Sequence, residues 1–217
     1  MNSIFPILLP EYPLHQQYVE IDLSQSNVAL KQIDITSAIA MDTFIANFLT
    51  EHKASVAYGG YLEKRAIYDR SQVFKNKGTT PRRNIHLGVD FWCKAGTLIA
   101  TPFDASVHSF KNNNKLGDYG PTIILEHKLN NTTFYTLYGH LSLASIEQIE
   151  VGQRLKKGTV FCALGDHSVN GDYAPHLHYQ VIKDIGVHSG DYPGVCSSAT
   201  LATYKNNCPN PLSFPGL

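Results

Sequence analysis

Short apolar segments separated by turn residues fill the chain from residue 84 to about residue 187, and this pattern constrains the fold more than any other feature. The segments read GTLIATP, ASVHSF, TIILEH, TFYTLYGHL, TVFCALG and HLHYQVI, with Gly, Asn or Pro between them. Short runs of β-branched, aromatic and aliphatic residues bounded by such turns are typical of strands. The sequence therefore predicts a mainly β protein with a compact antiparallel core of barrel or sandwich form.

The residues before this region differ in character. Residues 38–52, AIAMDTFIANFLTEH, follow two possible N-caps, Thr36 and Ser37, and show the apolar spacing of one helical face at Ile39, Phe44, Ile45, Phe48 and Leu49. Residues 18–24, YVEIDLS, alternate as a half-buried strand does. We expect an N-terminal extension with one long helix over residues 1–75, a β domain over 76–190, and an irregular C-terminal tail over 191–217 that packs on the core.

Charge and hydropathy exclude several classes of partner. The 217 residues carry 18 basic and 18 acidic side chains, so no basic surface is expected to bind nucleic acid. No apolar run reaches the length of a membrane span, which predicts no membrane insertion. The first residues lack a basic start, and Pro6 and Pro10 interrupt their apolar run, so no signal peptide is expected. This predicts a cytoplasmic location, or a periplasmic or extracellular one if another route exports the chain.

The chain has four cysteines, Cys93, Cys162, Cys196 and Cys208, and no Cys-x-x-Cys pair. Without an export signal, buried free thiols are expected in place of two disulfides. A thiolate zinc site is improbable without closely spaced cysteines. A metal would therefore be bound by histidine and carboxylate side chains.

Two histidines one residue apart stand out in the segment NGDYAPHLHYQVI. On a strand, His176, His178 and Gln180 project from one face, and Leu177, Tyr179 and Val181 project from the other. An isolated His-x-His is more often the polar face of a half-solvated strand than a functional site. A metal or acid–base site needs partners elsewhere in the chain.

The segment RRNIHLGVDFW supplies such partners. His86 and Asp90 are separated by four residues, so both can face the same side of an extended chain as Gly88, which leaves space for an ion. His86, Asp90 and one of His176 or His178 would give two nitrogens and a carboxylate, with a fourth position open, which is the ligand count of a catalytic zinc site. A further histidine, His140, ends an apolar strand in TLYGHLS and could turn into the same groove.

The segments HLGVD, LYGHLS and PHLHYQV, in this order and with VGQRLKKGTVFCALG between the last two, resemble the lysostaphin-like (LytM-type) zinc metalloendopeptidases that cleave peptidoglycan cross-link peptides. The resemblance covers residues 84–183. It implies one Zn²⁺ per chain, bound by His86, Asp90 and His178, with His140 and His176 as catalytic histidines that do not bind the metal. It also implies a peptide or peptidoglycan substrate that contains Gly or D-amino acids, and cleavage by metal-activated water.

Two other functions fit the same residues. The chain could be a metal-loaded but non-catalytic regulatory or binding module whose groove the 1–75 extension blocks, or an intracellular metallohydrolase that acts on a small amide. Three tyrosines are candidates to donate a hydrogen bond to a developing oxyanion: Tyr68, Tyr119 and Tyr138. The remaining histidines lack partners at ligand spacing and are expected to have structural roles: His15, His52, His108, His127, His167 and His188.

Overall fold

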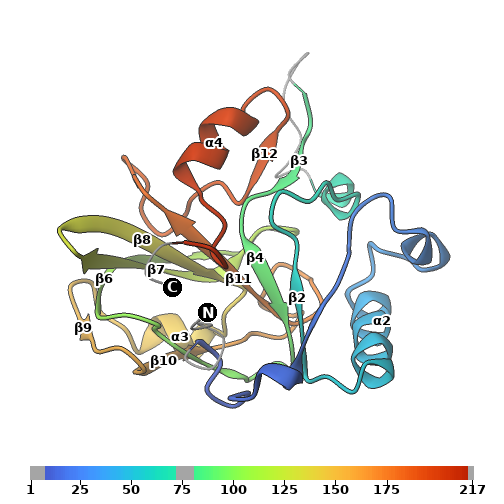
Figure 1. Ribbon diagram of the computed structural model, residues 1–217, viewed down its shortest axis with the longest axis horizontal. Coiled ribbons are helices and arrows are strands. Elements are labelled where there is room, and N and C mark those ends of the chain that lie inside the picture. Colours follow the sequence, from blue (N-terminus) through green and yellow to red (C-terminus); the bar gives the residue numbers. More distant parts are fainter. Residues whose placement is uncertain (1–7, 72–80, 215–217) are drawn as a thin grey trace.

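A computed structural model describes residues 8–71 and 81–214 of the protein. Its largest element is an eight-stranded sheet in the order β1-β2-β4-β11-β8-β7-β6-β9 (Figure 1). Strands β1 and β2 are parallel and all other neighbours are antiparallel. The strands are β1 (Tyr18–Glu20), β2 (Val56–Gly59), β4 (Val89–Trp92), β6 (Ala105–Asn113), β7 (Gly120–Leu129), β8 (Thr132–Gly139), β9 (Arg154–Leu155) and β11 (His176–Ile182). The predicted mainly β class is confirmed.

Two smaller sheets and a few helices complete the described fold. Strand β5 (Leu98–Ala100) pairs with β10 (Val160–Ala163), and β3 (Arg83–His86) pairs with β12 (Val195–Ser197). The α-helices are α2 (Ala38–Glu51), α3 (Leu143–Glu147) and α4 (Leu201–Asn207), and the 3₁₀ helices are η1 (His15–Gln17), η2 (Val28–Gln32) and η3 (Ile67–Arg70). Helix α2 is the long helix expected from the sequence.

Local sequence explains how the central hairpin forms. Strands β7 and β8 pair from Ile123 opposite Tyr138 to Leu129 opposite Thr132, so only Asn130 and Asn131 connect them. Both asparagines have positive φ, 48° and 63°. Two-residue hairpin loops need positive φ at both positions to match the twist of the strands, and asparagine tolerates that conformation.

Strand β11 lies between β4 and β8 near the centre of the large sheet, and all seven of its residues are buried. Leu177, Tyr179 and Val181 belong to the main apolar cluster of the core. By the alternation of a strand, the two histidines lie on the opposite face. The predicted strand at HLHYQVI is therefore present, and its polar face is buried instead of solvated.

The N-terminal region adds strands to the same sheet. Strand β2 pairs with β4, and β1 extends the sheet by one more strand. The side chain of Ser37 caps α2 by accepting a hydrogen bond from the Ala40 amide. The apolar face of α2 packs near Trp92. Ile39, which was expected on this face, is 69% exposed, so the buried face of the helix is narrower than the sequence indicated. Strand β1 also ends at Glu20, earlier than the expected strand over 18–24.

The C-terminal tail is not irregular, contrary to the sequence-based expectation. Strand β12 forms main-chain pairs with β3, with Val195 opposite His86. Helix α4 packs Leu201 and Tyr204 against a second apolar cluster that includes the buried Cys208. Regular structure forms here because β3 offers a free edge to a short strand, which a local pattern of turn residues does not reveal. The expected division between residues 75 and 76 lies outside the described residues, and the division of the chain into three parts stays a prediction.

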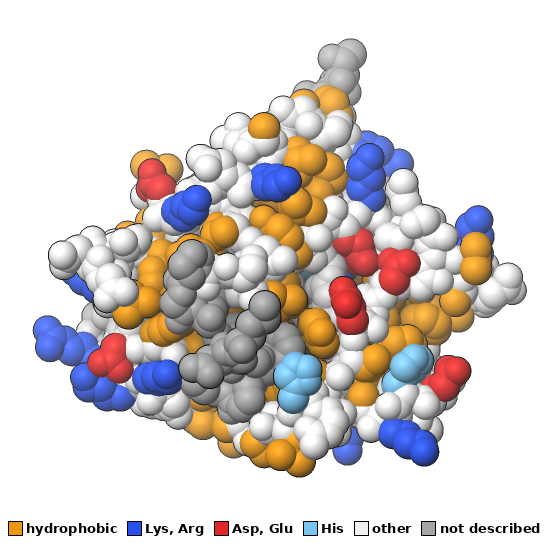
Figure 2. All heavy atoms as spheres, viewed as in Figure 1, with side chains coloured by type: hydrophobic (Ala, Val, Ile, Leu, Met, Phe, Trp, Pro, Cys, Tyr) orange, Lys and Arg blue, Asp and Glu red, His pale blue; other side chains and the backbone are white. Residues whose placement is uncertain are grey.

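The distribution of surface charge and the state of the cysteines agree with the sequence-based expectations. Positive and negative side chains both occur across the face shown in Figure 2. All four cysteines are free and buried. Within residues 8–71 and 81–214, no helix has the length and apolar character needed to cross a membrane.

Candidate metal site

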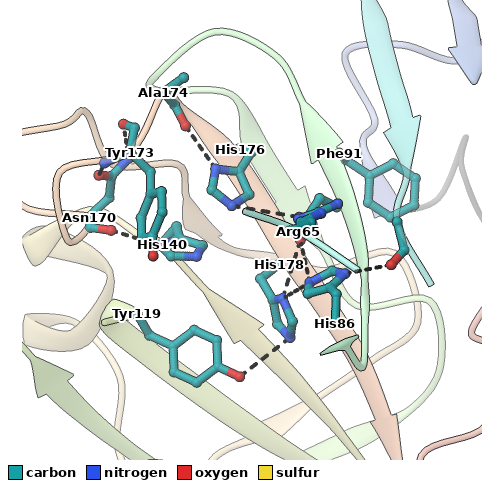
Figure 3. Close-up of polar contacts among 12 residues, drawn as sticks. Arg65, His86, Phe91, Tyr119, His140, Asn170, Tyr173, Ala174, His176 and His178 are labelled. Carbon is teal, nitrogen blue, oxygen red and sulfur yellow. Dashed lines mark hydrogen bonds and ion pairs between the residues drawn. The ribbon is translucent and has the colours of Figure 1, made fainter. Parts of the chain in front are cut away.

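Three of the side chains singled out in the sequence meet at one point. The ligand atoms of His86, Asp90 and His178 all lie within 4.8 Å of one another, and all three residues are buried. Figure 3 shows the rings of His86 and His178 next to each other. His86 Nε2 lies 2.8 Å from His178 Nδ1, and Asp90 Oδ1 lies 3.2 Å from each of these nitrogens. In the described parts of the chain, this is the group of histidine and acidic side chains that could hold a metal ion.

Strand pairing places these three residues. His86 ends β3, Asp90 lies in the following strand β4, and the β4–β11 register sets Asp90 directly opposite His178. The chain bends between the two strands at Gly88. A Cβ atom on Gly88 would lie 2.7 Å from the His178 ring and 2.8 Å from the Tyr179 carbonyl oxygen. The space next to His178 therefore depends on glycine at this position, as the sequence suggested.

Hydrogen bonds behind the two histidines fix which nitrogen faces the third ligand. His86 Nδ1 lies 2.9 Å from the Gly60 carbonyl oxygen, and His178 Nε2 lies 2.9 Å from Gln180 Oε1. Both acceptors require a protonated ring nitrogen, so the opposite nitrogens carry lone pairs. In neutral rings these two lone pairs would be only 2.8 Å apart, and a cation bound by both nitrogens would offset their repulsion. A hydrogen bond from the second ring nitrogen to an oxygen, as both histidines make here, is typical of histidines that bind a metal.

Asp90 contributes an oxygen that has no hydrogen-bond partner. Its Oδ2 accepts a hydrogen bond from Arg65 at 2.5 Å, whereas the buried Oδ1 is unpaired. Burial alone would raise the pKa of this carboxyl, but His86 and Arg65 hold it well below its usual value, so the group is a carboxylate. The unpaired oxygen and two imidazole nitrogens have the donor set of a catalytic zinc site. The two 3.2 Å spacings are near the edge of about 3.3–3.6 Å of a tetrahedron with ligand distances of about 2.0–2.2 Å, whereas the 2.8 Å spacing between the nitrogens is shorter. The residues present fit a divalent metal.

His140 and His176 form a second pair beside these ligands. Their ring centroids are 4.2 Å apart. His140 Nδ1 donates to the Asn170 carbonyl oxygen at 2.7 Å, and His176 Nδ1 donates to the Ala174 carbonyl oxygen at 2.8 Å. Each Nε2 is therefore unprotonated. His176 Nε2 lies 4.0 Å from Asp90 Oδ2, too far for a direct hydrogen bond.

Burial keeps these imidazoles neutral. It lowers the pKa of His86 and of His176 to about 4, against the opposing attraction of Asp90. Burial and the neighbouring His176 and His178 hold the pKa of His140 well below its usual value. Neutral imidazoles can bind a metal or accept a proton, and near neutral pH all three are in that form.

The backbone at His140 has an unusual conformation. Its φ is +64°, a value that non-glycine residues rarely adopt. Its amide donates to the Tyr119 carbonyl oxygen at 2.8 Å, and its carbonyl oxygen accepts from the Gly165 amide at 2.9 Å. These two bonds hold the strained residue in place, and the turn after β8 directs its ring toward His176. Strain of this kind is concentrated at functional sites.

A cavity of about 200 Å³ opens onto all five side chains, and four tyrosines line it: Tyr68, Tyr119, Tyr173 and Tyr192. Burial raises the pKa of Tyr68 and Tyr119 above the usual value, so both phenols remain hydrogen-bond donors. Tyr138 was wrongly expected to line the groove. It is opposite Tyr179 in the β8–β11 register and packs in the core, on the face away from the histidines.

The other histidines lie elsewhere, with one exception. His127 contacts the Asp104 carbonyl oxygen and Thr136, which agrees with the structural role expected for it, whereas His188 lines the cavity. Sequence reasoning missed Arg65, Asn170, Tyr173 and the role of Gln180. Gln180 could have been found, because it shares a strand face with His178. Arg65 and Asn170 lie in loops, where spacing carries no such signal.

Trp92 packs behind the second histidine pair. Its ring stacks on that of His176 with centroids 3.9 Å apart and an angle of 22° between the planes. Its indole N–H is buried and has no hydrogen-bond partner. The stacking fixes the plane of the His176 ring.

Part of the chain is similar in sequence to known proteins. Residues 84–189 match the model of Peptidase family M23. A protein of Haemophilus influenzae described as an uncharacterized metalloprotease is 33% identical over 129 residues, which are 58% of this chain and 25% of that protein. The chain thus spans about a quarter of the length of that relative.

Solved structures of such peptidases are also similar to part of the chain. The catalytic domain of the antimicrobial peptidase lysostaphin from Staphylococcus simulans is 24% identical, with 56% of this chain and 80% of that one covered and a TM-score of 0.38. A zinc containing peptidase from Vibrio cholerae is 25% identical, with 50% of this chain and 30% of that one covered and a TM-score of 0.38.

Proposed function

We propose that this protein is a zinc-dependent metalloendopeptidase that cleaves a Gly- or D-amino-acid-containing peptide, such as a peptidoglycan cross-link, because residues 84–189 match the model of Peptidase family M23. The family match and the metalloprotease relative support a metallopeptidase. One observation carries the proposal. Two free imidazole nitrogens and an unpaired carboxylate oxygen converge at the end of a cavity that holds two further neutral histidines.

Zn²⁺ is the metal that this donor set suits, and His86, Asp90 and His178 would hold it. When bound, it supplies Lewis acidity that polarises a scissile carbonyl and makes a water molecule acidic enough to react near neutral pH. Asp90 and His178 lie on the paired strands β4 and β11 of the large sheet, and His86 ends β3 of a two-stranded sheet just before β4, so all three side chains come from regular strands that make the site rigid.

The two remaining histidines are the proposed acid–base groups. His140 and His176 each have an unprotonated Nε2 and a Nδ1–H bonded to a main-chain carbonyl. In this state each ring can accept a proton from the attacking water through Nε2. The same ring can then return the proton to the leaving amine, and the carbonyl behind Nδ1 stabilises the imidazolium in between.

Tyrosine hydroxyls are the proposed donors to the developing oxyanion. Tyr68 and Tyr119 both line the cavity and stay protonated. Tyr119 Oη lies 3.5 Å from His178 Nε2 and 3.2 Å from the Tyr192 carbonyl oxygen, close behind a metal ligand. Tyr68 lies in η3 and also lines the cavity.

The walls of the cavity favour a substrate with small side chains. A Cβ atom on Gly194 would overlap the Tyr119 hydroxyl and lie 3.3 Å from the His178 ring, so the wall is close-packed there. Gly117 also lines the cavity. A slim segment of glycine or small D-residues fits such a narrow approach, which supports a cross-link peptide over a bulky chain.

Turnover of purified peptidoglycan, measured as released amino groups, tests the proposal. The wild-type chain loaded with zinc should cleave it, and His140→Ala and His176→Ala should retain zinc and lose about 10²–10⁴-fold in rate. His108→Ala is the matched control, because His108 lies on β6 and bonds Ser109 outside the cavity. Full turnover by His140→Ala would refute the acid–base mechanism.

Wild-type protein that binds zinc and cleaves neither peptidoglycan nor a glycine-rich peptide would favour the regulatory module. Cleavage of small amides alone would favour the metallohydrolase.

A further inference from the structure

Residues 62–65 lie beside the metal site but precede the M23 match, which begins at residue 84. They are bonded to β3 by main-chain contacts. The Leu62 amide donates to the His86 carbonyl oxygen at 2.9 Å, the His86 amide to the Glu63 carbonyl oxygen at 3.0 Å, and the Arg65 amide to the Asn84 carbonyl oxygen at 3.0 Å. The segment is thus held against the strand that ends in a candidate ligand.

Two side chains of this segment, those of Arg65 and Glu63, form a series of ion pairs with Asp90. Arg65 Nη1 binds Asp90 Oδ2 at 2.5 Å, and Arg65 Nε binds Glu63 Oε2 at 2.5 Å. The other carboxylate oxygen of Glu63 accepts the Leu23 amide at 2.9 Å. The side chains of Arg65, Asp90 and Glu63 are only 6%, 2% and 11% exposed. Figure 3 shows Arg65 directly beside His86 and His176.

This arrangement determines how Asp90 can bind an ion. A free carboxylate can rotate and can offer one oxygen or both. Here the guanidinium holds Oδ2, so only Oδ1 faces the two imidazole nitrogens. A guanidinium next to a metal would repel it, but Glu63 neutralises that charge at contact distance. The Glu63–Arg65 pair therefore orients the Asp90 carboxylate and adds little net charge to the site.

Such a buried group is not explained by stability alone. Ion pairs inside a protein often contribute no more to stability than apolar side chains of similar size, because their desolvation cost is high. Contacts that hold a metal-binding carboxylate or imidazole from behind, in contrast, affect metal affinity directly.

We propose that Glu63 and Arg65 are positioning residues of the metal site, which fix Asp90 as a ligand through one oxygen. The N-terminal region then supports metal binding and does not block the groove. The inference rests on the proposed function only in taking His86, Asp90 and His178 as the ligands.

The test is cobalt binding by the full chain, measured by competition with a chelator and by visible absorption of the bound Co²⁺. Glu63→Gln combined with Arg65→Met removes both contacts without changing the net charge. We expect the Kd for Co²⁺ to rise about 10–100-fold and the absorption spectrum to change, because Asp90 becomes free to rotate. An unchanged Kd with an unchanged spectrum would overturn the proposal.

A matched control separates this effect from a general loss of stability. Arg70 also joins the N-terminal region to the M23 domain. It bonds Asp172 and lies over the Tyr173 ring, 4.5 Å from its centroid, without contacting a ligand. Arg70→Met combined with Asp172→Asn should lower the melting temperature and leave the cobalt spectrum unchanged. A spectral change in this control equal to that of the first variant would overturn the assignment to Glu63 and Arg65.

Arg65→Lys covers the case in which the double variant does not fold. Lysine keeps the charge, but its single ammonium group cannot bind Glu63 and Asp90 at the same time in the geometry of the planar guanidinium. We expect weaker Co²⁺ binding than in the wild type with an altered spectrum, and wild-type binding by this variant would also overturn the proposal. Cobalt binding without peptidoglycan cleavage by the wild type would refute the peptidase function alone.

Discussion

At the scale of single residues, the alternation of β11 assigns different tasks to two histidines on one face. His178 is opposite Asp90 in the strand register, and its Nδ1 is free because Gln180 binds the other nitrogen. His176 is held by Ala174 and lies against Trp92, with its nearest carboxylate oxygen 4.0 Å away. The two side chains therefore differ in access to the metal position although both are buried.

We predict that zinc content near one per chain in the wild type falls sharply in His86→Ala, Asp90→Ala and His178→Ala. Three protein ligands leave no redundancy, so loss of one removes most of the affinity. Metal analysis after gel filtration measures this, with His176→Ala as the control that keeps its zinc. Zinc loss from the His176 variant and retention by the His178 variant would reverse the assignment.

A histidine outside the site should influence stability as a function of pH. Burial lowers the pKa of His127 to about 4, so the folded protein keeps it neutral where the unfolded chain, with a pKa of about 6.5, takes up a proton. Its stabilising effect is complete above pH 6.5 and is lost as the pH falls from 6.5 to 4. We predict that His127→Gln, which can still donate and accept, reduces the loss of stability over this range.

Chemical denaturation at several pH values between 4 and 7 measures this effect. The comparison is between the two proteins, so the other buried histidines contribute equally to both. Identical pH dependence in the variant would show that His127 is not held neutral by the fold.

At the scale of elements, the turn between β3 and β4 is the most sensitive place in the site. We predict that Gly88→Ala weakens metal binding strongly, because the added methyl group meets both the His178 ring and the Tyr179 backbone. Chelator competition gives the affinity. Gly96→Ala is the control, since it is strained by its φ of +82° but has nothing within 4 Å of the added carbon.

This control should lose stability and keep its metal affinity. Wild-type affinity in Gly88→Ala would mean that His178 can shift without cost, and it would remove the argument that glycine reserves space for the ion.

The elements that sequence reasoning located share a physical basis. Helix α2 and strand β11 were predictable because capping and alternation are local properties, visible in Ser37 and in the spacing of His176 and His178. The metal triad was accessible because its motifs resemble a known family. Arg65 was not, since its role depends on a pairing between the N-terminal segment and β3 that no local pattern encodes. Strand β12 was missed for the same reason.

At the scale of the whole molecule, the N-terminal region shares one sheet with the region that matches the M23 model. Strands β1 and β2 cover the outer edge of β4, which carries Asp90, and residues of α2 pack near Trp92. We predict that a chain beginning at Pro81 unfolds at a lower temperature than the full chain and tends to aggregate, because an uncovered strand edge invites pairing with other molecules.

Calorimetry and gel filtration of the two chains test this prediction. Cooperative unfolding of the shorter chain at the wild-type temperature would instead support the division of the protein near residue 75 into separately folding parts.

The stacking of Trp92 on His176 has an optical consequence. Trp92 is the only tryptophan in the chain, so fluorescence excited at the red edge of protein absorption comes from one wall of the metal site. Its emission depends on the imidazole against which it lies and on any paramagnetic ion bound nearby. The protein therefore contains its own spectroscopic probe, and loading of the site with Co²⁺ can be followed as quenching of this single fluorophore without any added label.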